Sequence, residues 1–284
     1  MKERLLVLAK ASPEISSKYG HLVCVAGITD KGEWRRIYPI PWKIFWKGSE
    51  KNFKKKSWVE YELQSDRPSD YRPESRKIKF ETIKPLGPAN FGEIERILKQ
   101  KITTVEQLEE KGPKTQSIGV VEPKKILDFA HTTNSHYKEL IIKSAQTDLF
   151  GKPAVKLDIP RYKYRYIFKD DDSGRTHEML CEDWEVGELY RKCENYRKLG
   201  KYRDETEVHQ KVRQKMLSGI TKNKHIYFIV GSHYRFPTYL IVGVIYPKKQ
   251  ICLHCKIIHQ RWLKTQESTS EGNELQTIRS KATF

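Results

Sequence analysis

The sequence lacks the short motifs that mark several large enzyme classes. Its 284 residues contain no G-x-S-x-G nucleophile turn, no Walker A phosphate loop and no G-x-G-x-x-G dinucleotide turn. Nothing in the sequence therefore indicates a serine nucleophile or a glycine-rich loop that binds nucleotide phosphates.

Cysteines and long apolar runs are also scarce. The five cysteines are odd in number and irregular in spacing, which argues against a disulfide framework and for a reducing compartment. No apolar run approaches the roughly 20 residues that span a bilayer, and the N-terminal run MKERLLVLAK is too short for a signal peptide. We therefore expect a soluble, cytoplasmic protein that does not contact a membrane.

Positive charge, by contrast, is abundant. Lysine and arginine total 54 against 36 acidic residues, so the net charge is +18, and the cations are spread over both halves of the chain. A folded protein this basic is typical of one with an anionic partner, nucleic acid first.

Aromatic residues stand among the cations between Trp34 and Trp58. Four of the six tryptophans lie in this stretch. Cations neutralise phosphates, and aromatic rings stack on unpaired bases at about 1–3 kcal/mol per base. Strand alternation and the turn that follows it predict a nucleic-acid surface formed by Trp34, Arg36, Tyr38, Lys43, Trp46 and Lys47. The alternative is a buried aromatic core beside a solvated lysine turn at Lys54–Lys56.

Two later segments could contact phosphates as well. Cations alternate with tyrosines in RYKYRY, so Arg161, Lys163 and Arg165 share one face of a predicted strand. The alternative for this strand is a solvated cationic face over a tyrosine-lined core. Farther on, the loop GSHYRFP between two apolar strands carries His233, Tyr234 and Arg235, and its alternative is an ordinary hairpin tip.

The predicted fold class is α+β. Five short β-patterned segments in residues 1–86 predict a small N-terminal β-barrel of the OB or SH3-like type. One of them, His21–Ile28, is apolar at both its odd and its even positions, which predicts a strand buried on both faces. Residues 87–153 are predicted to form a helical middle segment with a short strand. Its first two helices are expected at Phe91–Lys99 and Thr104–Lys111, and Thr103 or Thr104 followed by Glu106 or Glu109 could cap the second. Residues 154–263 predict a second β-rich unit with two helices packed on it, and residues 264–284 a disordered tail.

Five stretches of the chain carry a resemblance to a known family. They are KYGHLVCVAGI, GEWRRIYPIPW, SIGVVEPKKILDF, HEMLCEDWEVGELYRKC and IYFIVGSHYRFPTYLIVGVIYP. They resemble an uncharacterised prokaryotic family with paired small β-barrels. The resemblance runs from Met1 to about Gln250 and implies OB-like domains, but it brings no established activity.

Zinc binding is one chemistry that the sequence allows. Cys252 and Cys255 form a C-x2-C pair, and His259 follows four residues later. Zinc takes four sulfur or imidazole donors, so His177 or Cys181 could complete this set only if the fold brings them close. The alternative is two half-buried cysteines on a terminal strand.

Metal-dependent cleavage of nucleic acid is the other chemistry that the sequence allows. Metal-dependent nucleases hold Mg²⁺ with carboxylates and place a lysine beside them, and Glu122-Pro123-Lys124 has this E-x-K form. Asp170–Asp172 and Asp183 would supply further carboxylates. Matches this short arise by chance in a chain with 32% charged residues.

The leading hypothesis is a protein that binds DNA or RNA without intrinsic catalysis and without a resident cofactor. It predicts oligonucleotide binding that weakens steeply with salt. One alternative is a nuclease that uses Glu122, Lys124 and Asp183. The other is a basic adaptor subunit that meets a protein partner in a larger defence or mobile-element complex.

Overall fold

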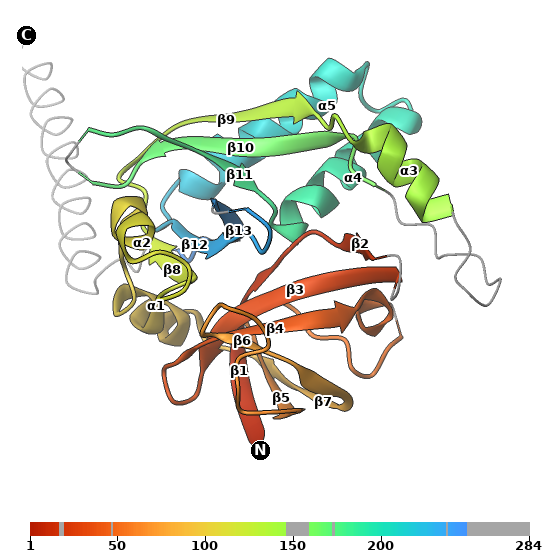
Figure 1. Ribbon diagram of the computed structural model, residues 1–284. Helices are drawn as coiled ribbons and strands as arrows, with labels where there is room; N and C mark the ends of the chain where they lie inside the picture. Colours follow the sequence, from red (N-terminus) through yellow and green to blue (C-terminus); the bar gives the residue numbers. More distant parts are fainter. Residues whose placement is uncertain (17–19, 47, 146–158, 172–173, 237, 249–284) are drawn as a thin grey trace, which may run out of the picture. The chain divides into compact units, whose positions relative to one another are not determined.

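Two β-sheets and their covering helices make up the part of the chain that the structure describes. The structure is a computed structural model (Figure 1), and it describes residues 1–248 except 17–19, 47, 146–158, 172–173 and 237. Residues Met1–Pro247 form one compact unit. No helix in the described part of the chain is both long enough and apolar enough to cross a membrane.

The first sheet curls into a half-barrel (Figure 1). Its strands are β1 (Lys2–Lys10), β2 (Glu14–Ser16), β3 (Gly20–Thr29), β4 (Trp34–Pro41), β5 (Ser57–Leu63), β6 (Ser75–Arg76) and β7 (Ile78–Pro88). The strand order is β6-β4-β3-β1-β5-β7, with β2 paired to β3. Only the β4–β6 pair is parallel among the described pairs of this sheet. A 3-10 turn, η1 (Trp42–Phe45), follows β4.

The strand predicted to be buried on both faces is β3, and this prediction is confirmed. Val23 and Val25 point into the core that the curled sheet encloses. Ala26 and Ile28 point into a second core, which lies against the other sheet. An apolar sequence at both parities is needed here because neither face of β3 meets water.

The second sheet is also mixed, with strand order β8-β12-β13-β11-β10-β9. Its strands are β8 (Ile118–Val121), β9 (Lys125–Thr133), β10 (Tyr162–Lys169), β11 (His177–Cys181), β12 (Tyr227–Ser232) and β13 (Tyr239–Ile245). The helices are α1 (Phe91–Lys99), α2 (Val105–Lys111), α3 (Tyr137–Ala145), α4 (Trp184–Lys198) and α5 (Glu205–Gln214), and α5 continues into a π-helical turn, η2 (Lys215–Gly219).

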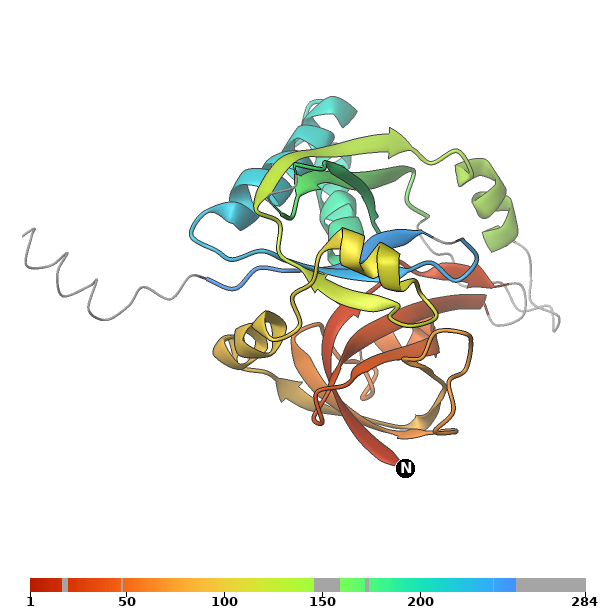
Figure 2. The ribbon, with the colours of Figure 1, turned by 60° about the vertical axis from the view of Figure 1, so that its left-hand side comes forward.

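Each face of the second sheet packs on a different layer. One face meets the first sheet, where Leu6 and Leu8 of β1 share a core with Val242 of β13. The other face is covered by α4 and α5, and here Tyr166 of β10 shares a core with Val212 of α5 (Figure 2). The tyrosine side of the RYKYRY alternation therefore lies in this core, as one of the two interpretations of that strand predicted.

The α+β class and the two β-rich parts are confirmed. The middle segment supplies α1, α2 and α3, but it also supplies β8 and β9 to the second sheet. Strand β11 had no counterpart in the sequence prediction, because its five residues, HEMLC, are too short and too polar to show a clear alternation. The predicted tail lies outside the described residues.

Candidate nucleic-acid interface

The β12–β13 hairpin ends in an exposed aromatic tip. Its strands are mostly buried and pair with each other, which fixes the hairpin, whereas the connecting loop runs over the surface. Tyr234 and Phe236 in this loop are 57% and 60% exposed. Large aromatic side chains held at the surface by a rigid hairpin are typical of a binding surface.

Tyr71 and Arg72 hold the tip in place from the loop between β5 and β6. The Tyr71 hydroxyl lies within donating distance, 3.1 Å, of the carbonyl oxygens of His233 and Tyr234. The Tyr71 and Tyr234 rings stack with their centres 5.9 Å apart. Arg72 places its guanidinium 5.4 Å from the Tyr234 ring centre and donates to the Ser232 carbonyl at 3.2 Å. The tip is thus fixed by residues about 160 positions earlier in the chain.

A buried polar network beneath the tip includes Arg36. This side chain is only 2% exposed, and its guanidinium donates to the carbonyl and hydroxyl oxygens of Ser117, each at 3.3 Å. Ser117 in turn donates to both carboxylate oxygens of Glu74, at 2.9 and 2.7 Å. Arg36 therefore links the two sheets and does not present its charge to solvent.

The face shared by Trp34, Arg36 and Tyr38 points towards the second sheet. Trp34 packs against the core between the sheets. Tyr38, at the far end of the same strand, is half-buried, and its hydroxyl donates to Glu14 at 3.5 Å. The alternation along the strand correctly placed these three residues on one face. It could not show that the second sheet covers that face.

Charged groups surround Tyr38 and the hairpin tip. Burial and Glu14 raise the pKa of Tyr38 to about 12, while the charge of Arg235 opposes this shift. Burial lowers the pKa of His233. The charge of Glu14 opposes this shift, while the charges of Arg235 and Lys163 add to it. Because these groups affect one another, we treat them as one surface. The hairpin patch comprises Tyr38, Tyr71, Lys163, His233, Tyr234, Arg235 and Phe236.

The tryptophan-rich stretch is mostly part of the protein core. Trp42 stacks on Trp184 with ring centres 4.0 Å apart, and Trp58 packs against the core between the sheets. Trp46 is 43% exposed and Lys43 is exposed on η1. Lys47 lies outside the described residues. Among the residues of this stretch that we predicted to bind nucleic acid and that the structure describes, Trp46 and Lys43 are the exposed ones.

The other two predicted cations, one just before β10 and one within it, are paired with carboxylates. Arg161 lies 3.3 Å from Glu205, and Arg165 lies 2.9 Å from Glu178. Exposed pairs of this kind are worth little in stability and can exchange partners. Of the three predicted cations on this strand, Lys163 is the one that joins the hairpin patch.

The residues considered for a nuclease are separated from one another. The Glu122 carboxylate lies 3.7 Å from His225, and Lys124 is exposed. Asp183 instead forms a buried ion pair with Lys55, at 2.5 Å. In the described part of the chain, the donor atoms that gather closely enough to hold a metal ion do not include those of Glu122 or Asp183.

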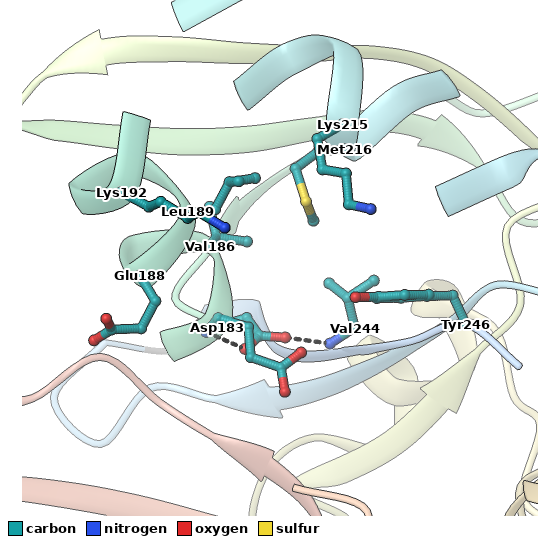
Figure 3. Close-up of a pocket in the computed structure, with 10 residues that line it drawn as sticks. Asp183, Val186, Glu188, Leu189, Lys192, Lys215, Met216, Val244 and Tyr246 are labelled. Carbon is teal, nitrogen blue, oxygen red and sulfur yellow. Dashed lines mark hydrogen bonds between the residues drawn. The ribbon is translucent and has the colours of Figure 1, made fainter. Parts of the chain in front are cut away.

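Asp183 has a structural role. One of its oxygens accepts from the backbone N–H of Glu185 at 2.9 Å and caps α4, and the other accepts from Val244 N–H at 2.6 Å. Figure 3 shows Asp183 at the edge of a cavity of about 240 Å³, with Met216 on the opposite side. Both oxygens of Asp183 are thus used within the fold.

The proposed zinc ligands Cys252, Cys255 and His259 lie outside the described residues. Of the residues that might have completed the set, Cys181 is buried, and burial raises the pKa of its thiol. His177 lies 2.9 Å from Asp170. Its partners are therefore carboxylates within the described chain.

Sequence reasoning missed two members of the hairpin patch, Tyr71 and Phe236. Both are aromatic residues in turn-rich segments, SDRPSDYRPES and SHYRFP, where a core role is less expected. Aromatic residues in turn-rich segments could therefore have indicated an exposed surface, but they do not show that the two loops meet.

Two sequence-family models match the chain in succession. Residues 1–106 match a domain of unknown function, DUF8758, and residues 99–268 match another domain of unknown function, DUF8757. The second model covers more than half of the 284 residues. A search of the curated proteins found no match. The expectation of a two-domain arrangement without an established activity is therefore confirmed.

Proposed function

The chain belongs to the family defined by the domain of unknown function DUF8757, and we propose that it binds single-stranded nucleic acid at the hairpin patch. In this proposal Tyr234 and Phe236 stack on unpaired bases, while Arg235 and Lys163 contact phosphates. The observation that carries the proposal is the exposure of two aromatic rings on a hairpin tip that other loops hold rigidly.

The charge balance at the patch favours single strands over duplexes. Glu14 acts on the pKa of His233, and Lys163 acts on the pKa of Glu182, which burial raises. The patch itself contributes two cations, Arg235 and Lys163, and the carboxylate of Glu14 offsets part of their charge. Specific duplex binders make about 6–10 phosphate contacts. Ring stacking requires unpaired bases but far fewer charges.

The proposal also includes the sequence-based predictions of an OB-like fold, a cytoplasmic location and a prokaryotic origin. The curled first sheet serves as an OB-like platform for the patch, in a cytoplasmic protein of prokaryotic origin. The resemblance drawn from the sequence supports this part of the proposal.

Fluorescence anisotropy with labelled single-stranded DNA, single-stranded RNA and duplexes tests the proposal. We expect single strands to bind more tightly than duplexes. Tyr234→Ala and Phe236→Ala should each weaken single-strand binding by about 5- to 150-fold, the equivalent of about 1–3 kcal/mol of lost stacking. Phe91→Ala is the matched control, because Phe91 on α1 is 54% exposed but lies outside the patch.

Salt dependence tests the cations of the patch. With two phosphate contacts, the logarithm of affinity should fall against the logarithm of salt concentration with a slope of about −1.4, and Arg235→Ala should reduce this slope by about 0.7. Preference for duplexes, or affinity unaffected by the two aromatic variants, would overturn the proposal. Salt-independent co-purification of one protein that is lost in the same variants would favour the adaptor hypothesis instead.

A further inference from the structure

Three potential metal ligands meet at the opposite end of β10 from Lys163. Asp170 directly follows β10, His177 begins β11, and Glu106 lies in the first turn of α2. Their donor atoms all lie within 4.8 Å of one another. Lys163 and Asp170 are seven positions apart along an extended strand, a distance of about 23 Å, so this cluster is distinct from the hairpin patch.

The spacing of the donor atoms fits a bound cation. Nε2 of His177 lies 2.9 Å from an oxygen of Asp170 and 3.1 Å from Oε1 of Glu106. When a metal ion lies about 2.1 Å from each of two donor atoms and the donor–metal–donor angle is about 90°, the two donors are about 3.0 Å apart. The separations of His177 from Asp170 and from Glu106 therefore already match those of two donors on one metal ion.

Hydrogen bonding alone leaves this cluster incomplete. The imidazole N–H at Nε2 can point at only one acceptor, and Asp170 takes that bond. Both oxygens of Glu106 are shielded from solvent and lack a hydrogen-bond partner among the described residues. The Arg175 guanidinium lies 3.7 Å from Oε1 of Glu106, close enough for an ion pair but too far for a hydrogen bond. A cation between the three side chains would satisfy Glu106, whereas a single proton cannot serve both carboxylates.

The surroundings orient the donors as a metal site needs. The second oxygen of Asp170 accepts from the backbone N–H of Val105 at 2.8 Å, which fixes the carboxylate. His177 and Asp170 are 5% and 6% exposed, while 31% of the Glu106 side chain is exposed. The two buried donors are therefore held in place, and Glu106 is the most exposed of the three residues, although its carboxylate oxygens are shielded.

We propose that Glu106, Asp170 and His177 bind a divalent transition-metal ion of the Mn²⁺ or Zn²⁺ class. One imidazole with two carboxylates suits these ions, whereas Mg²⁺ takes oxygen ligands and keeps several of its waters. The ion would tie α2 to the ends of β10 and β11, which are otherwise joined here by the Asp170–Val105 hydrogen bond and ion pairs to Arg175.

Titration of the full-length protein with Mn²⁺, followed by the loss of the free-ion EPR signal, tests this proposal. We expect one bound Mn²⁺ per chain and an affinity at least about 10-fold weaker in Glu106→Gln. Zn²⁺ should compete for the same site. Bound Mn²⁺ should also broaden the backbone amide NMR signals of Val105 and His177, which places the ion in the structure. Mn²⁺ is the primary probe because it disfavours the thiolates of Cys252 and Cys255.

Two further variants make the result decisive. Glu109→Gln is the matched control: Glu109 lies in the same helix and pairs with Arg175 at 2.9 Å, but it is not part of the donor cluster, so affinity should not change. Cys252→Ser should also retain full Mn²⁺ affinity. Circular dichroism of Glu106→Gln checks that the variant folds, which its partial exposure favours. Absence of both Mn²⁺ and Zn²⁺ binding, equal affinity in Glu106→Gln, or broadening elsewhere would overturn the proposal.

Discussion

Lys55 shows how far a single residue can depart from its local pattern. The lysine run Lys54–Lys56 predicted a solvated turn, and Lys54 is exposed, but Lys55 is 5% exposed. Its ammonium group contacts Asp183 at 2.5 Å and the Val244 carbonyl at 3.3 Å. Burial alone would lower the pKa of Lys55, but the nearby carboxylates outweigh burial and raise it, so the side chain stays charged. The prediction of a solvated turn was wrong for this residue.

Replacing Lys55 should therefore be costly. In Lys55→Met the carboxylate of Asp183 stays buried without its counter-ion, and we expect the free energy of unfolding to fall by about 3–5 kcal/mol. Urea unfolding followed by tryptophan fluorescence measures this change. Lys54→Met, at an exposed neighbouring position, should stay within about 0.5 kcal/mol of the wild type. A loss below about 1 kcal/mol in Lys55→Met would show that the ion pair contributes little.

A buried histidine of helix α5 contacts both β9 and β10. His209 stacks on His131 of β9 with ring centres 3.7 Å apart, and its Nδ1 lies 3.0 Å from the Tyr164 hydroxyl of β10. Burial lowers the pKa of His209 to about 4, and the nearby His131 adds to this shift. The contact between the helix and the sheet therefore depends on a neutral imidazole.

This contact predicts a loss of stability in mild acid. A pKa of about 4 in the folded state, against 6.5 in the unfolded chain, means that the unfolded chain binds the proton more tightly. The stabilisation is complete above pH 6.5 and is lost as the pH falls towards 4. We expect about 2 kcal/mol, less than the full shift implies, because His209 borders a cavity of about 320 Å³ that admits water.

Urea unfolding at pH 7 and pH 4.5 measures this effect. His209→Gln cannot titrate in this range, so its free energy of unfolding should decline less than that of the wild type by about the same 2 kcal/mol. An equal decline in both proteins would assign the pH dependence to other groups.

In the whole molecule the two sheets are in tight contact where β13 packs on β1. A Cβ atom added to Gly243 would lie 2.7 Å from the carbonyl oxygen of Leu8 and 2.9 Å from the Cβ of Ala9. Both contacts are shorter than packed atoms allow, and the first involves backbone, which cannot move aside cheaply. Glycine at this position therefore permits the layer between the sheets to close.

Gly243→Ala should separate the sheets locally and lower the free energy of unfolding by about 1–3 kcal/mol. Gly187→Ala is the matched comparison, because a Cβ there meets nothing closer than Arg191 at 3.6 Å. That change, inside α4, should instead raise stability by about 0.5–1 kcal/mol. Thermal unfolding of both variants measures the contrast. Equal and small shifts would indicate that the sheets tolerate extra volume at Gly243.

Local patterns predicted the elements well and their partners poorly. The sequence placed a helix at Phe91–Lys99, where α1 lies, and a cap at Thr103 or Thr104. Thr104 is the cap, although Gln107 rather than Glu106 or Glu109 completes the capping box. The hairpin tip with His233 and Arg235 was found because turn residues separate two apolar runs. Tyr71 was not connected to it, since loop residues show no periodicity that indicates their neighbours.

The sequence by itself determined the fold class, the basic character and the identity of most strands and helices, because these depend on composition and on contacts within a few residues. Tertiary structure alone decided which cations are available to a partner. Packing of one sheet on the other buried Arg36 and Lys55 and brought Tyr71 to Tyr234. It also assembled Glu106, Asp170 and His177 from three separate elements. Whether a charge meets solvent, a carboxylate or a ligand depends on contacts between distant segments, which spacing along the chain does not specify.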